Sequence, residues 1–186
     1  MEVHSKIKMK IDPNKIILQD IIKLPGFKFD KYKKLRESKL SIISQNCFGG
    51  MLYHRFKLQF LSPTINLFIK LDAFLKMISD LKCYMNYKIK FKKADYNKAS
   101  GLVFPIFNLG DIELFMIHYN DFVEAEEKWN ERVQRINWEN LLIVTTAKSE
   151  EELEIFDSLP YEKKACFVQF KSNLKSAFYL PPNLND

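Results

Sequence analysis

The stretch NLLIVTTAKSEEELEIFDSLPYEKKACFVQF, from Asn140 to Phe170, indicates the fold class. It begins with a continuous apolar run, which is typical of a strand buried on both faces of a parallel sheet. A capping box, Ser149 to Glu152, then opens a helix that stops at Pro160, and a second apolar run follows around Cys166. Strand, helix and strand joined by short connections predict parallel strands with a crossover helix between them.

Hydrophobic spacing outside this stretch predicts the remaining elements. The helix expected over 120–138 has Asn120 or Asp121 as its cap, and Gly110-Asp111 is expected to form a turn between strands. Further predicted helices are 14–23, 30–39 and 71–86, with another beginning near Gly49-Gly50, and further strands are 40–44, 87–93 and one or two within 101–119.

Together these elements predict one α/β domain over 1–186, with three layers: a mostly parallel or mixed sheet with helices on both faces. Residues 1–38 are expected to form a helical lead-in, 39–170 the core and 171–186 a C-terminal tail. A hydrophobic content of 47% in 186 residues is enough for a sizeable core.

Composition narrows the classes of partner. The net charge of +6 is compatible with an anionic ligand or peripheral contact with a membrane. Nearly all of the excess is lysine, however, and no nucleic-acid signature appears, so nucleic acid is the weakest partner class. The three cysteines are widely spaced, which predicts neither a disulfide framework nor a metal site, and nothing indicates a cofactor. With no signal core and no membrane-spanning run, we expect a cytoplasmic protein.

The turn SQNCFGG, residues 44–50, is the best candidate for chemistry because it joins a predicted strand to a predicted helix. Cys47 is a candidate nucleophile there, since a helix N-terminus favours the thiolate. The backbone amides of Gly49 and Gly50 are alternatively a site for a phosphate or an oxyanion. A third interpretation is a buried cysteine beside glycines that a tight turn requires. The turn lacks the nucleophile-elbow pattern, since Gln45 stands where a glycine is needed.

A nucleophilic cysteine needs a base, and the histidines are His4, His54 and His118. His118 ends a predicted strand, so it meets Cys47 if the two strands run parallel in one sheet. Asp111, Glu113 and Asp121 stay open as the residue that orients this histidine. The structural alternative, a strand-end histidine with no catalytic role, also stays open.

Other polar and aromatic residues have both a binding and a structural interpretation. Trp129, Arg132 and Arg135 fall on roughly one helix face, which suits a sugar ring and a phosphate or carboxylate. The alternative is a tryptophan that anchors the helix, with arginines that complement its dipole. Ser62, Thr64 and Asp72 are helix caps by default, with Asp72 as a candidate for substrate contact.

Three blocks carry a resemblance: SQNCFGGMLYHRFKLQFLSPTINLFI, MIHYNDFVEAEEKWNERVQRINWENLLIV and FDSLPYEKKACFV. They resemble a bacterial family of exopolysaccharide biosynthesis proteins (domain of unknown function nineteen-nineteen), in the right order from about Ser41 to Phe170. The family's motifs correspond here to Asn46, Cys47, Gly49, Gly50, Ser62–Thr64, Asp72, His118, Tyr119, Trp129, Arg132, Arg135, Ile136 and Asn137. The chain departs from the family in having Thr145-Thr146-Ala147 where an aspartate tends to follow the strand.

The resemblance implies surface-polysaccharide assembly in a bacterium and an α/β fold, and it implies no known reaction. The leading hypothesis is an enzyme that acts on an activated sugar or saccharide intermediate in exopolysaccharide or capsule synthesis. In its sharpest form this is a group transferase or hydrolase with Cys47 as nucleophile and His118 as base. The residues then expected at the substrate are Asn46, Gly49, Gly50, Ser62, Thr64, Asp72, Tyr119, Trp129, Arg132 and Arg135. The alternative is a non-catalytic subunit that binds a nucleotide-sugar or other polysaccharide-synthesis proteins.

Overall fold

The computed structural model describes residues 29–96 and 101–181. The chain divides into two units, Met1–Ser38 and Lys39–Asp186. In the first unit, helix α2 (Phe29–Glu37) confirms the helix predicted over 30–39. The helix predicted over 14–23 and His4 lie outside the described residues.

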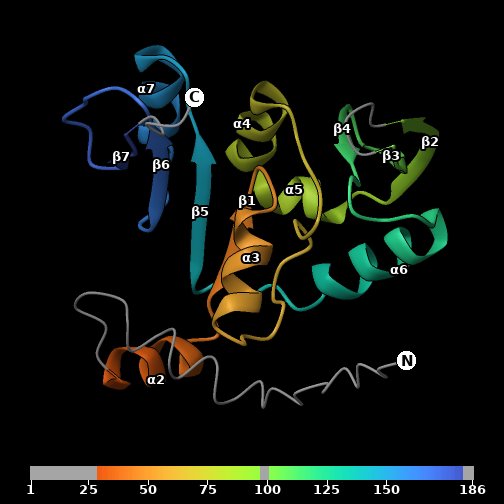
Figure 1. The fold of residues 1–186 in the computed structure, drawn as a ribbon, viewed down its shortest axis with the longest axis horizontal. Helices are drawn as coiled ribbons and strands as arrows, with labels where there is room; N and C mark the ends of the chain where they lie inside the picture. The colour runs from red at the N-terminus through yellow and green to blue at the C-terminus, as the bar shows by residue number, and fades with distance from the viewer. Residues whose placement is uncertain (1–28, 97–100, 182–186) are drawn as a thin grey trace, which may run out of the picture. The chain divides into compact units, whose positions relative to one another are not determined.

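The second unit carries the other described helices and strands (Figure 1). The helices are α3 (Phe48–Arg55), α4 (Leu71–Ser79), α5 (Leu81–Asn86), α6 (Phe122–Val133) and α7 (Glu150–Ser158). The strands are β1 (Ser41–Ser44), β2 (Ile89–Tyr96), β3 (Val103–Leu109), β4 (Ile112–Phe115), β5 (Leu141–Thr146), β6 (Lys164–Val168) and β7 (Ala177–Tyr179).

The α/β class is confirmed, and the strands are divided between two sheets. The order β1-β5-β6-β7 forms a sheet whose neighbouring strands are all parallel, as crossover connections require. β2, β3 and β4 form a separate antiparallel meander. Gly110, at φ +60°, makes the predicted tight turn between β3 and β4, a conformation that glycine adopts without strain.

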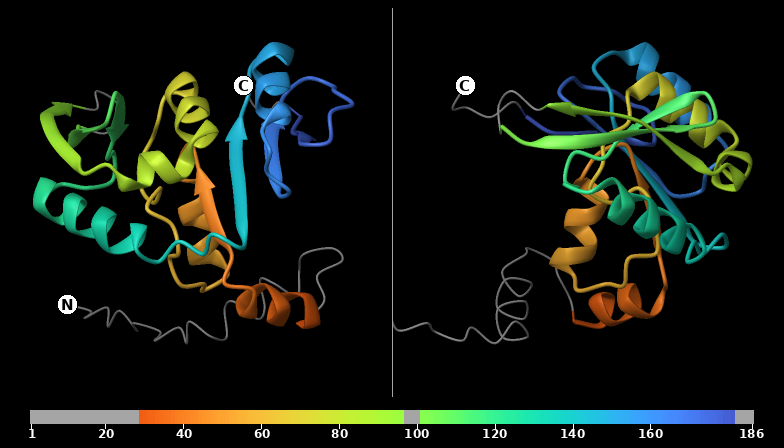
Figure 2. Two further views of the ribbon diagram at one scale, coloured as in Figure 1. Left: turned by 180° about the vertical axis from the view of Figure 1, so that it is seen from behind. Right: turned by 90° about the vertical axis from the view of Figure 1, so that its right-hand side faces the viewer.

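Helices cover both faces of the parallel sheet. Ile42 and Val144 point to one face, where they pack against Tyr53 of α3. Ile43 and Ile143 point to the other face and join a larger core with residues of α4, α5 and α7. Figures 1 and 2 show α4 and α5 between the two sheets, so this core joins both sheets in the second unit.

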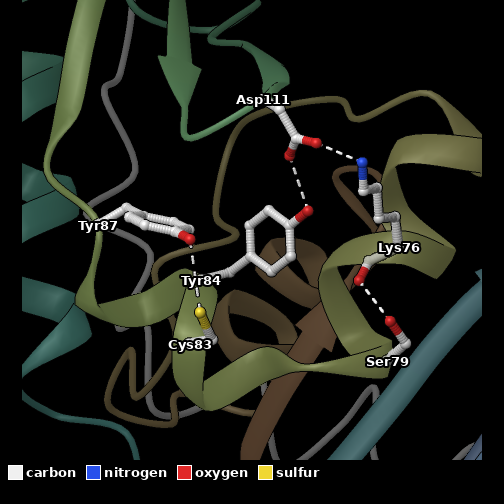
Figure 3. A network of polar contacts seen from close by, with 6 residues as sticks. All are labelled: Lys76, Ser79, Cys83, Tyr84, Tyr87 and Asp111. Atoms are coloured by element: carbon white, nitrogen blue, oxygen red, sulfur yellow. Dashed lines mark hydrogen bonds and ion pairs between the residues drawn. The ribbon is translucent and has the colours of Figure 1, made fainter.

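A network of polar contacts links the β3–β4 turn to α4 and α5 (Figure 3). The carboxylate of Asp111 accepts a hydrogen bond from Tyr84 Oη at 2.8 Å and pairs with Lys76. Cys83 is half-buried. Its Sγ atom donates to Tyr87 Oη at 3.5 Å. These contacts account for Asp111 as a structural residue.

The structure differs from the sequence predictions at three places. The helix predicted over 71–86 is two helices, because Asp80 leaves the helical conformation and its side chain caps Cys83 N. No helix starts at Ser62 or Thr64, since the described segment up to Lys70 is extended or irregular. The predicted tail contains β7, which pairs with β6.

Both predicted helix caps of the C-terminal half are present. Asp121 accepts from Val123 N at 2.7 Å, and Ser149 Oγ accepts from Glu152 N at 3.3 Å. Among the described residues, no helix has the length and apolar character needed to cross a bilayer.

Candidate functional site

Cys47 lies where the chain passes from β1 into α3. It is the N-cap residue of α3, and its side chain makes no capping hydrogen bond. The first helical amides are instead used by neighbouring side chains: Phe48 N donates to Asn46 Oδ1 at 3.0 Å, and Gly49 N donates to Ser44 Oγ at 3.1 Å. Asn46 Oδ1 and the Gly49 amide are therefore engaged in forming the turn, and their contact with a substrate stays a prediction.

The two glycines of the turn have different surroundings. A Cβ atom on Gly49 would lie 2.6 Å from Ser44 Oγ and 3.3 Å from Ile42 Cγ2, so α3 packs directly on β1 there. A Cβ atom on Gly50 would lie 3.4 Å from the nearest atoms, which belong to Asn66 and Ile65. Gly49 is therefore a packing residue, whereas Gly50 faces the loop that follows α3.

His118 contacts Cys47. Its Nε2 atom lies 3.0 Å from Cys47 Sγ, within hydrogen-bond range for sulfur. The backbone amide of His118 donates to Asn66 O at 3.3 Å, and Phe68 pairs with Phe115 just before it. The segment that follows β4 is therefore held on the loop after α3, and this brings the two side chains together across 71 residues of sequence.

Burial raises the pKa of the Cys47 thiol above its ordinary value, since this residue is half-buried. A backbone hydrogen bond of the residue itself lowers the pKa in part. Desolvation is the larger effect, so the direction of the shift gives no support to a thiolate at the helix N-terminus. An S–H group beside an exposed imidazole is the arrangement that general-base activation requires.

Ser62 and Thr64 hold the loop onto β1. Both are fully buried, Ser44 N donates to Thr64 Oγ1 at 2.9 Å, and Thr64 N donates to Ser62 Oγ at 3.2 Å. Their burial supports the structural interpretation, and substrate contact by these two residues stays an untested prediction. Their role is to position the loop that supplies Asn66 and Leu67 around the Cys47–His118 pair.

Residues of α6 that were predicted to share a binding face are separated. Trp129 is 2% exposed and belongs to the core. Arg132 is 7% exposed, donates to Tyr119 Oη at 2.6 Å and lies over the ring of Phe60. Arg135, at the surface, pairs with Glu131. The buried Tyr119–Arg132 pair and the core position of Trp129 favour the structural interpretation of this helix, and a sugar and phosphate site on it stays a prediction.

Hollows on the described part of the second unit include two of different lining. One, of about 570 Å³, is lined by Gly50, Met51, Leu52, His54, Arg55, Phe60 and Asn66. The other, of about 440 Å³, contains Asp72 and is lined otherwise by Lys70, Ala73, Lys92, Asn108, Gly110, Asp111, Ile112 and Glu113. The two share no lining residue, so Asp72 belongs to a different part of the surface from the first hollow.

No cluster of three or more histidine, cysteine, aspartate or glutamate side chains suited to a metal ion occurs in the described part of the chain.

Comparison of the sequence with known protein families identifies the family of this chain. A family model described as "Domain of unknown function (DUF1919)" matches residues 19–186.

The chain belongs to the DUF1919 family. A protein of Haemophilus influenzae, described as "Uncharacterized protein", is 30% identical over 152 residues, which is 80% of this chain and 71% of that protein. Neither description names a reaction or exopolysaccharide synthesis.

The structure also shows a residue of this DUF1919 protein that the sequence did not single out. Gln45 is 5% exposed, and its Oε1 atom accepts from Thr145 Oγ1 at 2.9 Å and from Thr146 Oγ1 at 3.3 Å. Gln45 therefore ties the end of β1 to the end of β5, directly before the Cys47 turn. The sequence feature that could have indicated this contact is the Thr145-Thr146 pair, because the resembled family tends to have an aspartate at this place.

Proposed function

We propose that this DUF1919 protein is an enzyme that transfers or hydrolyses a group by way of a covalent intermediate on Cys47, with His118 as its general base. One observation carries the proposal: the 3.0 Å contact between Cys47 Sγ and His118 Nε2 at the carboxyl end of a parallel strand. That end is where α/β proteins commonly place ligands. A thiol and an imidazole at this distance are suited to attack on a carbonyl carbon, so an acyl group is the group that we expect to be transferred.

The steps balance without a cofactor. Cys47 Sγ attacks the carbonyl carbon of an ester or thioester while His118 Nε2 takes the thiol proton. The bond to the leaving group breaks, and the leaving group receives the proton from the imidazolium. The acyl-cysteine is then attacked by the hydroxyl of an acceptor or by water, again with His118 as base, and the thiol is restored.

The acceptor we propose is a saccharide intermediate of bacterial exopolysaccharide or capsule synthesis. The sequence blocks around Cys47, His118 and Trp129 support this part of the proposal, and it does not depend on any contact in the structure. It is tested in the native host: deletion of the gene should alter the surface polysaccharide, and the native gene but not Cys47→Ser should restore it. An unaltered polysaccharide in the deletion strain would refute this setting while leaving the chemistry untouched.

The chemistry is tested with an activated ester. Incubation with p-nitrophenyl acetate should release a burst of nitrophenolate and leave one acetyl group on Cys47, as seen by peptide mass spectrometry. His118→Asn should slow the burst by about 10²–10⁴-fold, the usual contribution of a general base. Cys83→Ala removes another half-buried thiol and is the matched control, which should leave the burst unchanged.

Two outcomes of the acetylation assay would contradict the covalent mechanism. If Cys47 is not acetylated, or if His118→Asn is acetylated as fast as the unmodified protein, the covalent mechanism is wrong. The non-catalytic alternative, a subunit that binds a nucleotide-sugar or another polysaccharide-synthesis protein, then becomes the better account. The half-burial of Cys47, which raises the pKa of its thiol, favours this alternative, because a packed thiol is less reactive.

A further inference from the structure

The side-chain amide of Gln45 is held at its oxygen by two threonines of β5. Oε1 accepts hydrogen bonds from Thr145 Oγ1 at 2.9 Å, from Thr146 Oγ1 at 3.3 Å and from Thr146 N at 3.4 Å. A backbone N–H group can only donate, so its contact identifies the oxygen end of the amide. Within the described part of the chain, Nε2 of Gln45 has no acceptor in hydrogen-bond range. Its two N–H groups are therefore available to a ligand.

The rest of this side chain is enclosed by protein. Gln45 is 5% exposed. A buried amide usually has partners at both of its ends, because desolvation costs free energy that only a hydrogen bond returns. Among the described residues, Ser176 Oγ is the side-chain atom that is fully buried without a partner, so Gln45 Nε2 keeps access to the surface. A largely buried amide whose nitrogen alone reaches the surface is suited to donating to an oxygen atom of a ligand.

The amide is anchored at the same end of the sheet as the candidate nucleophile. Gln45 follows the last residue of β1 and precedes Cys47 by two positions. The segment after α3 contacts both residues: Ile69 N donates to Gln45 O at 2.9 Å, and Cys47 Sγ lies 3.9 Å from Leu67 O. The threonines that hold the amide end β5, the parallel neighbour of β1.

The proposed reaction needs a hydrogen-bond donor beside the thiol. Attack of Cys47 Sγ on a carbonyl carbon forms the S–C bond and moves an electron pair of the C=O bond onto the oxygen, which becomes an oxyanion. Backbone amides at a helix start commonly stabilise such an oxygen. Here the amides of Phe48 and Gly49 already donate to side chains of the turn. The amide of Gln45 next to this turn is not used in that way.

We infer that Gln45 is the oxyanion donor of the proposed acyl transfer, and that its Nε2 donates to the carbonyl oxygen of the substrate as negative charge forms there. This inference rests on the proposed function, since it adds a residue to the same reaction. When the tetrahedral intermediate collapses, the electron pair returns to the carbonyl, the bond to the leaving group breaks, and the leaving group takes the proton from His118. Gln45 gains and loses no proton in these steps.

The test compares two reactions of the same thiol in the full chain. Acetylation of Cys47 by p-nitrophenyl acetate passes through an oxyanion, whereas alkylation by iodoacetamide takes place at a saturated carbon and does not. Both rates are followed by peptide mass spectrometry at one pH. The ratio of acetylation to alkylation reports the oxyanion donor, because ionisation of the thiol affects both reactions.

Two variants remove the donor in different ways. Gln45→Glu keeps an oxygen that accepts from Thr145 and lacks the NH₂ group, and Gln45→Met is its uncharged counterpart. We expect each to lower the ratio of acetylation to alkylation by about 10²–10³-fold, the usual effect of losing one oxyanion donor. Gln59→Glu makes the same charge change at an exposed glutamine and is the matched control, which should keep the native ratio.

The outcomes separate this inference from the proposed function. If the native protein is acetylated at Cys47 and both Gln45 variants keep the native ratio, the inference is wrong and the reactive cysteine stands. If the native protein is not acetylated at Cys47, the proposed covalent chemistry fails and the inference fails with it. An equal fall of both rates in the Gln45 variants would assign the effect to the structure of the turn and would also overturn the inference.

Discussion

Replacement of Gly49 by alanine is the most direct test of how the Cys47 turn is built. The new Cβ atom would lie 2.6 Å from Ser44 Oγ, 3.2 Å from Ser44 Cβ and 3.3 Å from Ile42 Cγ2. Rotation of the Ser44 side chain relieves only the first contact, and it breaks the hydrogen bonds of this hydroxyl to Gly49 N and Asn46 O. α3 must therefore move away from β1.

The size of the effect follows from two opposing terms. Overpacking of this kind costs about 1–3 kcal/mol, while alanine in a helix gains at most about 1 kcal/mol over glycine. We expect Gly49→Ala to lower the free energy of unfolding by up to about 2 kcal/mol, the difference of those terms. Gly50→Ala is the matched control, because its Cβ contacts begin at 3.4 Å and it should be neutral or slightly stabilising.

Urea unfolding followed by linear extrapolation resolves a difference of this size. A double variant adds a check: Ser44→Ala removes the closest atom, so it should cost less in the Gly49→Ala background than alone, with a coupling of about 0.5–3 kcal/mol. If Gly49→Ala is as stable as Gly50→Ala, the proposed close packing of α3 on β1 is wrong.

Three further predictions concern the ionisation and packing of buried groups. Because burial raises the pKa of Cys47, its alkylation by iodoacetamide should follow a pH profile with a midpoint above the ordinary thiol value of about 8.5, and a midpoint below about 7 would contradict the neutral pair. Burial raises the pKa of Tyr53 to about 12, so the folded state keeps a proton that the unfolded chain loses above about pH 10. The stability advantage of the native protein over Tyr53→Phe should therefore shrink by about 1.4 kcal/mol between about pH 8 and pH 11, and a constant difference in urea unfolding would disprove it. Tyr119→Phe removes the acceptor of the buried Arg132 and should lower the free energy of unfolding by about 1–3 kcal/mol, whereas the exposed Tyr96→Phe should not; equal stability of the two variants would count against the buried pair.

The candidate pair shows how a correct prediction can rest on an incorrect premise. Cys47 and His118 were expected to meet because their strands would lie in one sheet. They meet although β1 and β4 belong to different sheets, because the loop after α3 pairs with Phe115 and accepts a hydrogen bond from His118 N. Their proximity is a finding of the structure, and their catalytic roles stay a proposal.

The local elements of this protein can be predicted from its sequence alone. The buried strands, the caps at Asp121 and Ser149 and the turn at Gly110 follow from residues close together in the chain, because hydrogen bonds and apolar periodicity act over a few positions. The sequence also narrowed the candidate base to three histidines, of which His118 contacts the thiol.

The tertiary structure decides which of the predicted site residues a ligand can reach. Thr64 and Trp129 have polar or aromatic side chains that suit substrate binding, yet both are buried by segments distant in sequence. The same long-range packing desolvates Cys47 and raises the pKa of its thiol. Burial depends on the sum of contacts from the whole unit, which no local pattern contains.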